Sequence, residues 1–336
     1  MTTAAARALR ENLPELLVEV NERLAVDARY ECGGPGCDQL ATSAEYQRRF
    51  GDLLAATFEF DLADSLQEEF GWFVSTLSRR GFAPDYFSRM LEAWSLAVMS
   101  QLGSHEAAEL AAPIDRLRRQ LGVLLEGQPR TSRLGDAAVE FLGRLRQRRR
   151  RDAADYLVSL SGSGQPAGSI VSDVVLPALA ELGARWQRAE ITVADEHVAT
   201  AVCRYAILRL FDSLDRAASN GKRALVCCAP GEEHELAAEL VAEYLDLKGW
   251  EVFSVGRSSP QDDILKAVGS FRPDSIFISV TLVANLPAAH DLVMALRQAL
   301  PGAAVVLGGR AAVLARAKLE GPGVKVVARF DEAGDR

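Results

Sequence analysis

The sequence lacks the features that would direct the protein out of the cell or onto nucleic acid. It has no run of 18 apolar residues, and charged residues and a proline interrupt Met1 to Leu17, so neither a membrane span nor a signal peptide is expected. The five cysteines form no even, regularly spaced framework, which favours a reducing compartment. Basic residues are outnumbered by acidic ones, since the chain has 38 Lys and Arg and 46 Asp and Glu, which gives a net charge of -8. We expect a cytoplasmic protein that contacts neither membranes nor nucleic acid directly.

The first 130 residues are predicted to form an all-helical domain. The chain of 336 residues is 49% apolar, which is enough for two or three domain cores. Apolar residues recur three and four apart in this first segment, and no β-like alternation interrupts them. Twelve of the 23 aromatic residues lie between Tyr30 and Trp94, so the aromatic mass of the protein is concentrated here.

A small unit of four helices is expected at residues 134–216. Helical periodicity runs through 153–160, 170–186 and 194–214, with a break at the Ser-Gly repeat 161–164. Six arginines lie in its first part, between Arg144 and Arg151. They indicate a solvated helix face or a connector, with a phosphate-binding or partner-binding patch as the alternative.

Residues 221–336 predict a doubly wound, five-stranded parallel sheet. Short β-rich runs alternate with amphipathic helices at 224–229, 251–255, 275–281, 303–307 and 324–328. In such sheets ligands bind beyond the carboxyl ends of the strands, at the switch in strand order. The loops after the first, third and fourth strands are therefore the candidate site.

One histidine, His234, lies in the loop after the first strand. It can reach a ligand over the sheet edge, and Glu232 can accept the proton of its other ring nitrogen, which fixes the tautomer. This arrangement suits a metal with a single histidine ligand. Zinc fits poorly because it needs three or four protein ligands. A helix-capping or surface histidine is the alternative.

Three motifs in this order resemble the cobalamin-binding Rossmann-like domain. They are Glu232-x-His234-x-x-Ala237, the Ser279-Val280-Thr281 end of the third strand, and Gly308-Gly309 after the fourth. The resemblance implies that His234 is the lower axial ligand of cobalt and that Glu232 supports it. It further implies polar contacts from Ser279 and Thr281 to the displaced nucleotide tail, and a close approach of the tail to Gly308 and Gly309. The family usually has glycine where this chain has Ala237.

A second motif in the four-helix unit resembles the cap of light-sensing adenosylcobalamin regulators. Trp186 is followed after nine residues by Glu196-His197. By periodicity alone these residues are a core tryptophan and an acidic helix start. The resemblance implies that Trp186 packs on the adenosyl group and that Glu196 and His197 make polar contacts there. A covered upper face favours a sensor over a methyl carrier.

The first domain resembles the globin-like, bilin-holding domain of photocobilins in its architecture. That resemblance implies biliverdin as a second chromophore, with Cys32 and Cys37 or His105 as candidate contacts; a plain aromatic core, free thiols and a surface histidine are the alternatives. The function expected is a light sensor and not an enzyme, since a mutase barrel needs roughly 250 residues. The sensor is expected to be a homo-oligomer. The competing hypothesis is a non-photochemical corrinoid-binding protein, either a methyl carrier or a cobalamin or redox sensor that acts on a partner regulator.

Overall fold

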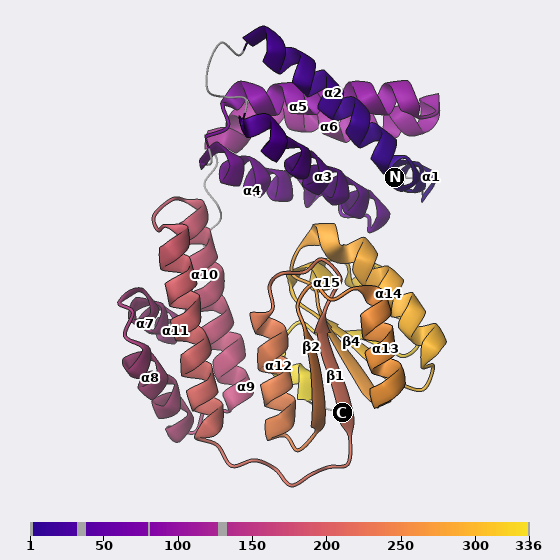
Figure 1. Cartoon of the computed structure of the whole chain (residues 1–336). Helices are drawn as coiled ribbons and strands as arrows, with labels where there is room; N and C mark the ends of the chain where they lie inside the picture. Colours follow the sequence, from indigo (N-terminus) through magenta and orange to yellow (C-terminus); the bar gives the residue numbers. More distant parts are fainter. Residues whose placement is uncertain (1–2, 32–37, 80, 127–132, 335–336) are drawn as a thin grey trace. The chain divides into compact units, whose positions relative to one another are not determined.

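The computed structural model describes residues 3–31, 38–79, 81–126 and 133–334. The chain divides into two compact units, Met1–Gln128 and Pro129–Arg336. Each unit is described by itself below (Figure 1).

The first unit is all-helical. Its helices are α1 (Thr3–Glu11), α2 (Leu13–Glu31), α3 (Asp38–Glu59), α4 (Leu66–Arg79), α5 (Pro84–Gln101) and α6 (Ser104–Glu126). Phe50, Phe70 and Trp94 are completely buried, and the ring centroid of Phe50 lies 5.3 Å from that of Phe70 and 5.6 Å from that of Trp94. Most of the concentrated aromatic residues therefore belong to the hydrophobic core of this unit, while Trp72 is exposed.

The second unit begins with the predicted helical cap. Its helices are α7 (Asp136–Arg146), α8 (Arg150–Gly162), α9 (Ala167–Ile170), a π-helical turn η2 (Val171–Val175), α10 (Leu176–Gln187) and α11 (Val193–Asp212). The segments α9, η2 and α10 follow one another without a break, so the cap has four helical rods. The rod Ala167–Gln187 is long and apolar enough to cross a membrane by length and composition alone. Its buried residues, Ile170, Val174 and Leu182 among them, pack in the core of the cap.

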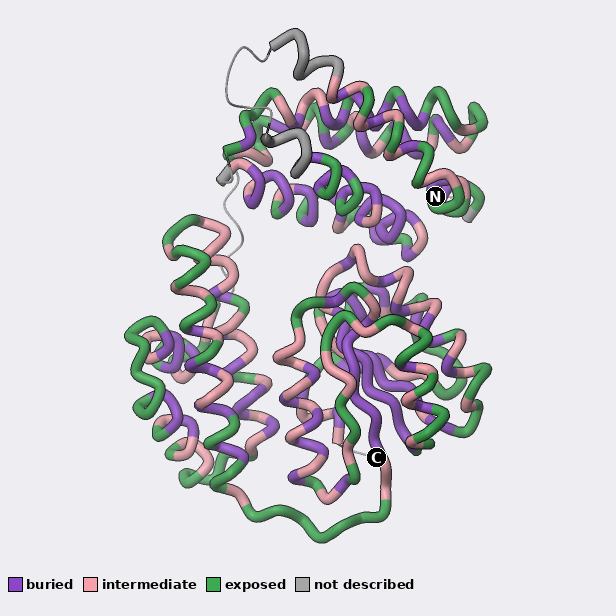
Figure 2. Tube along the Cα trace, in the orientation of Figure 1, coloured by how far each residue is buried: buried purple, intermediate pink, exposed green. Residues whose placement is uncertain are grey.

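The sheet of the second unit is parallel throughout, in the order β2-β1-β3-β4-β5. The strands are β1 (Arg223–Cys228), β2 (Glu251–Gly256), β3 (Ser275–Ser279), β4 (Ala304–Gly308) and β5 (Val324–Val326). Helix α12 (Leu236–Leu247) covers one face and lies beside the cap, while α13 (Gln261–Phe271) and α14 (Leu286–Ala299) cover the other (Figure 1). The short helices α15 (Arg310–Leu314) and α16 (Arg316–Leu319) connect the last two strands. The predicted α/β fold with a helical cap is confirmed, and β1 and β3 are buried along their length (Figure 2).

Two strands end two residues earlier than the sequence predicted, for an identifiable reason. β3 stops at Ser279 because the backbone N–H of Thr281 donates to the Glu232 carboxylate and not to a neighbouring strand. β5 stops at Val326, and the N–H of Ala328 donates to the Glu332 side chain. In both places a side-chain carboxylate accepts the backbone N–H hydrogen bond that would otherwise have continued the β-sheet pairing.

Candidate functional site

The site lies where β1 and β3 separate, at the switch point of the sheet. Helix α12 follows β1 on one face of the sheet and α14 follows β3 on the other (Figure 1), and doubly wound sheets bind ligands at such a switch point. The turn after β1 contains Gly231 at φ 81°, a left-handed conformation that glycine adopts without strain. This turn is followed by Glu232, whose side chain is buried, and by His234, whose side chain is largely exposed.

The Glu232 side chain is completely buried and connects the loops after β1 and β3. Its Oε1 accepts hydrogen bonds from the backbone N–H of His234 at 3.1 Å and from His234 Nδ1 at 2.6 Å. Its Oε2 accepts from the backbone N–H groups of Thr281 at 2.9 Å and Leu282 at 3.0 Å, and from Asn285 Nδ2 at 3.0 Å. Both carboxylate oxygens are therefore fully used by donors from two loops.

These donors keep the carboxylate ionised. Burial by itself would raise the pKa of Glu232, but the hydrogen bonds from His234, Leu282 and Asn285 outweigh it and lower the pKa to about 2. An ionised carboxylate can only accept hydrogen bonds, so Nδ1 of His234 must carry its proton. The other ring nitrogen, Nε2, is left with its lone pair available for a ligand when the ring is neutral.

His234 combines this fixed tautomer with access to solvent, since 56% of its side chain is exposed. The hydrogen bond to Glu232 raises the pKa of His234, burial opposes the rise, and the charges of Glu232 and Glu196 add to it. Glu196 belongs to the cap, so its charge acts on the same crevice as the sheet-edge histidine. No group of three or more His, Cys, Asp or Glu side chains could hold a metal ion within the described ranges. A metal at His234 would therefore have at most one further ligand of these types from the described residues.

The loops after β3 and β4 place the other predicted residues at the same edge. The Ser279 hydroxyl is buried and has no hydrogen-bond partner in the described part of the chain. An orphaned hydroxyl at a strand end fits the predicted polar contact to a ligand. Thr281 is half-buried, and Ala237 lies in the first turn of α12.

The two glycines after β4 play different parts. Gly309 has φ 99°, and a Cβ there would lie 2.4 Å from the carbonyl oxygen of Val280. Its close approach is therefore to the chain's own β3 loop. A Cβ at Gly308 would meet only Val327 at an ordinary 3.5 Å.

The predicted cap residues lie at the end of the cap where α10 finishes and α11 begins. Trp186 is half-buried in the last turn of α10. Glu196 accepts from Thr200 Oγ1 at 2.7 Å, and its other oxygen lies 2.7 Å from His197 Nδ1. The side chain of His197 is 74% exposed. Both parts of the cap motif, Trp186 and the Glu196–His197 pair, thus lie at the two helix ends that flank one turn.

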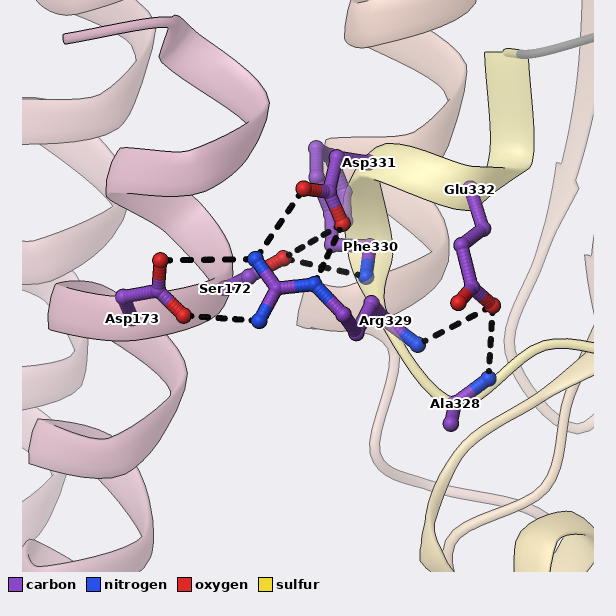
Figure 3. Close-up of polar contacts among 7 residues, drawn as sticks. All are labelled: Ser172, Asp173, Ala328, Arg329, Phe330, Asp331 and Glu332. Carbon is purple, nitrogen blue, oxygen red and sulfur yellow. Dashed lines mark hydrogen bonds and ion pairs between the residues drawn. The ribbon is translucent and has the colours of Figure 1, made fainter.

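Cap and sheet are joined at two places, which we call the base and the rim. At the base, beside the C-terminal turn η4 (Phe330–Gly334), Arg329 forms a fork with Asp173 at 2.8 and 3.3 Å and also binds Asp331 at 3.0 Å (Figure 3). Ser172 donates to Asp331 at 3.2 Å and accepts from the N–H of Phe330 at 3.1 Å (Figure 3). Both cap residues belong to the π-helical turn η2, and π-bulges are frequent at functional positions.

At the rim, beside His234, partly exposed ion pairs lie next to Leu240 of α12, which is buried in the core of the cap. Arg204 of α11 binds Glu235 at 3.2 Å and Glu239 at 2.8 Å, with Arg204 41% exposed. Sequence reasoning missed Arg204, Asn285 and the whole of the base. The loop after the third strand was already a candidate, and that position was the one available signal for Asn285.

The features that suggested a bilin have structural roles where the first unit is described. Most of the aromatic residues lie in the core, and His105 is 75% exposed with Glu109 at 3.6 Å. Cys32 and Cys37 lie outside the described residues. The predicted globin likeness and the bilin stay predictions.

Comparison with known proteins identifies the class of the second unit. Residues 222–334 match a family model described as the B12 binding domain, and residues 137–210 match a second family of the same description. Most of the second unit is therefore similar to proteins of the B12 binding domain families.

Two curated relatives are the HTH-type transcriptional repressors CarH and CarA of Myxococcus xanthus. The chain is 34% identical to CarH over 143 residues, which cover 42% of this chain and 46% of the repressor. It is 33% identical to CarA over 138 residues, 40% of this chain and 45% of the repressor. The chain thus spans less than half of each repressor it matches.

A solved structure supports the fold. The monomethylamine corrinoid protein of Methanosarcina barkeri aligns with a TM-score of 0.51 at 15% identity, over 60% of this chain and 96% of that protein.

Proposed function

We propose that the chain binds adenosylcobalamin between the cap and the carboxyl edge of the sheet and acts as a light-responsive regulator. The observation that carries the proposal is the Glu232–His234 pair. Nδ1 of His234 is held at 2.6 Å by a buried carboxylate, and Nε2 is available at an exposed edge. This is how proteins prepare a histidine to bind a metal. The cobalamin-binding domain matches and the identity to CarH support the same ligand.

The residues present suit the cofactor on both of its faces. His234 would bind cobalt from below, with Glu232 holding the ring in orientation and increasing its basicity. Ser279 and Thr281 would contact the tail, and Trp186 with Glu196 and His197 would cover the upper ligand. When bound, adenosylcobalamin supplies a cobalt–carbon bond that light can break. Trp186 would then lose the group it packs against, and the cap would repack, which is the proposed signal.

This proposal is for a sensor and not for an enzyme. Two curated relatives, CarH and CarA, are repressors. A tryptophan over the upper face would occupy the space that a methyl carrier must open to a second protein. Homo-oligomer formation, an unidentified downstream partner and a cytoplasmic location belong to the same proposal.

The first test is the absorption spectrum of the purified protein with adenosylcobalamin, before and after light. We expect a histidine-ligated spectrum in the dark and a change in hydrodynamic size after light. His234→Ala should remove the histidine-ligated spectrum and weaken binding more than Glu232→Gln, because outer-shell partners typically change metal affinity about 10 to 100-fold. His105→Ala is the matched control and should change neither.

Two outcomes contradict the proposal in different ways. An unchanged dark spectrum in His234→Ala would remove His234 as the ligand. Cobalamin binding with no light-dependent change in size would favour the non-photochemical corrinoid carrier or redox sensor.

The first unit is proposed to hold biliverdin or, failing that, to dimerise or bind a partner. Co-expression with a biliverdin source should add a red-absorbing band if the bilin binds. A protein that shows cobalamin bands alone would leave the dimerisation or partner-binding role.

A further inference from the structure

An ionic cluster centred on the buried pair Glu181 and Arg188 lies at the end of α10, close in sequence to Trp186. The Glu181 side chain is 7% exposed and accepts hydrogen bonds from Arg185 Nε at 3.0 Å and Arg188 Nη2 at 2.9 Å. The Arg188 side chain is 9% exposed and also donates from Nε to Glu190 at 2.5 Å. The two arginines lie immediately before and two residues after Trp186, so the cluster holds the turn of helix that carries the tryptophan.

The turn from α10 to α11 is held from its other end as well. Thr192 and Asp195 form a capping box at the start of α11. Asp195 also pairs with Arg148 at 2.7 Å, so one of the six arginines noted in the sequence reaches this turn. Ala189, between the two helices, has φ 55°, a left-handed conformation that costs a residue with a Cβ about 1 kcal/mol. A turn that is strained and tied at both ends carries Trp186 on one side and Glu196 and His197 on the other.

The Glu181–Arg188 pair is a poor device for stability alone. Burying two charges costs about as much as their attraction returns, and apolar residues of similar size often stabilise a protein more. Oε2 of Glu181 and Nη1 of Arg188 are also buried without a hydrogen-bond partner in the described part of the chain, which adds to the cost. The pair instead restricts the conformation of the end of α10, because two buried charges can be satisfied in only a few arrangements.

We infer that Glu181 and Arg188 are positioning residues that set the selectivity of the site for the upper ligand of cobalamin. The inference rests on the proposed function. By holding the end of α10, the pair fixes the orientation of the Trp186 side chain. It also fixes the distance from Trp186 to Glu196 and His197. A cap fixed in this way discriminates a bulky adenosyl group from a small methyl group, whereas a loosened cap accepts both.

The test compares the dissociation constants of adenosylcobalamin and methylcobalamin, in the dark, for the full chain and its variants. The main variant is the double substitution Glu181→Leu/Arg188→Met, which replaces the pair by apolar side chains and leaves no buried charge unpaired. We expect its melting temperature to hold or rise. Its preference for adenosylcobalamin should fall about tenfold, the scale on which residues behind a ligand-contacting group act.

Three further variants frame the result. Trp186→Ala removes the side chain that is proposed to cover the adenosyl group, so its preference gives the value expected when the cover is lost. Glu181→Gln keeps the shape of the side chain and should lose part of the preference. Glu140→Gln/Arg144→Gln removes an exposed ion pair of the same cap, away from the turn, and should keep the full preference.

The outcomes separate this inference from the proposed function. Reduced preference with an unchanged histidine-ligated spectrum supports the inference. A wild-type protein that prefers adenosylcobalamin, together with variants that prefer it equally, overturns the inference alone. A wild-type protein without any preference overturns both.

Discussion

The base and the rim of the contact between cap and sheet are held by different kinds of interaction. At the base, the rings of Tyr244 and Phe330 lie 5.1 Å apart, and both residues are part of the buried core of the cap. The linker from α11 to β1 adds backbone hydrogen bonds from Ala217 to Leu247 and from Asn220 to Gly249, each 2.9 Å. At the rim, Arg204 and its two glutamates are partly open to solvent.

The difference indicates which end is held more strongly. Exposed ion pairs contribute about 0–1 kcal/mol, whereas buried aromatic rings bury 150–250 Å² each and dominate the energy of a contact. The rod that carries Asp173 at the base carries Trp186 thirteen residues later, roughly 20 Å along a helix. The ion pairs of both ends are partly exposed, and Leu240 of α12 is buried in the core of the cap, so the base differs from the rim chiefly in its aromatic rings.

The largest expected effect concerns the carboxylate under the rim, and it depends on pH. The folded pKa of Glu232 is about 2 against an ordinary 4.5, so its stabilisation is complete above pH 4.5 and is lost as the pH falls toward 2. This shift corresponds to about 3 kcal/mol. Urea unfolding at several pH values should show this loss in the wild type and not in Glu232→Gln. Parallel pH profiles of the two proteins would contradict the assignment.

The second prediction concerns the tight packing of the base. A Cβ on Gly168 would lie 2.8 Å from Asp331 Cβ and 3.2 Å from its Cα, so the contact must shift. Gly168→Ala should destabilise the protein by about 1–3 kcal/mol in urea unfolding.

Gly183→Ala is the matched control on the same rod, because a Cβ there meets nothing within 4 Å. It should stabilise the protein by about 0.5–1 kcal/mol. Equal effects at the two glycines would mean that the base is not tightly packed.

The smallest effect is expected at the rim. Arg204→Gln should change the free energy of unfolding by less than about 1 kcal/mol, since its ion pairs are exposed. It should nevertheless increase hydrogen exchange at the start of α11. Arg329→Gln should instead increase exchange in η2, at the base. An Arg204 variant that loosens η2 as much as the start of α11 would remove the distinction between the two ends.

The sequence predicted much of the fold because its signals are local. Apolar spacing marked the helices of both units, and β-rich runs between them marked all five strands of a parallel sheet. The rule that ligands bind at the carboxyl ends of such strands directed attention to the loop of Glu232 and His234. Their hydrogen bond joins residues two positions apart, so it too was within reach of local reasoning.

Contacts between distant segments were decided by the tertiary structure. Glu232 meets Thr281, Leu282 and Asn285, which lie 49 to 53 residues away, and no local pattern marks a carboxylate as their partner. The sequence predicted that the arginines near Arg148 form a solvated face or a connector. Arg148 nevertheless forms an ion pair with Asp195 in the turn between α10 and α11. Burial decided the roles of the first unit's aromatic rings and of the Glu181–Arg188 pair, because it depends on what the rest of the chain places around a side chain.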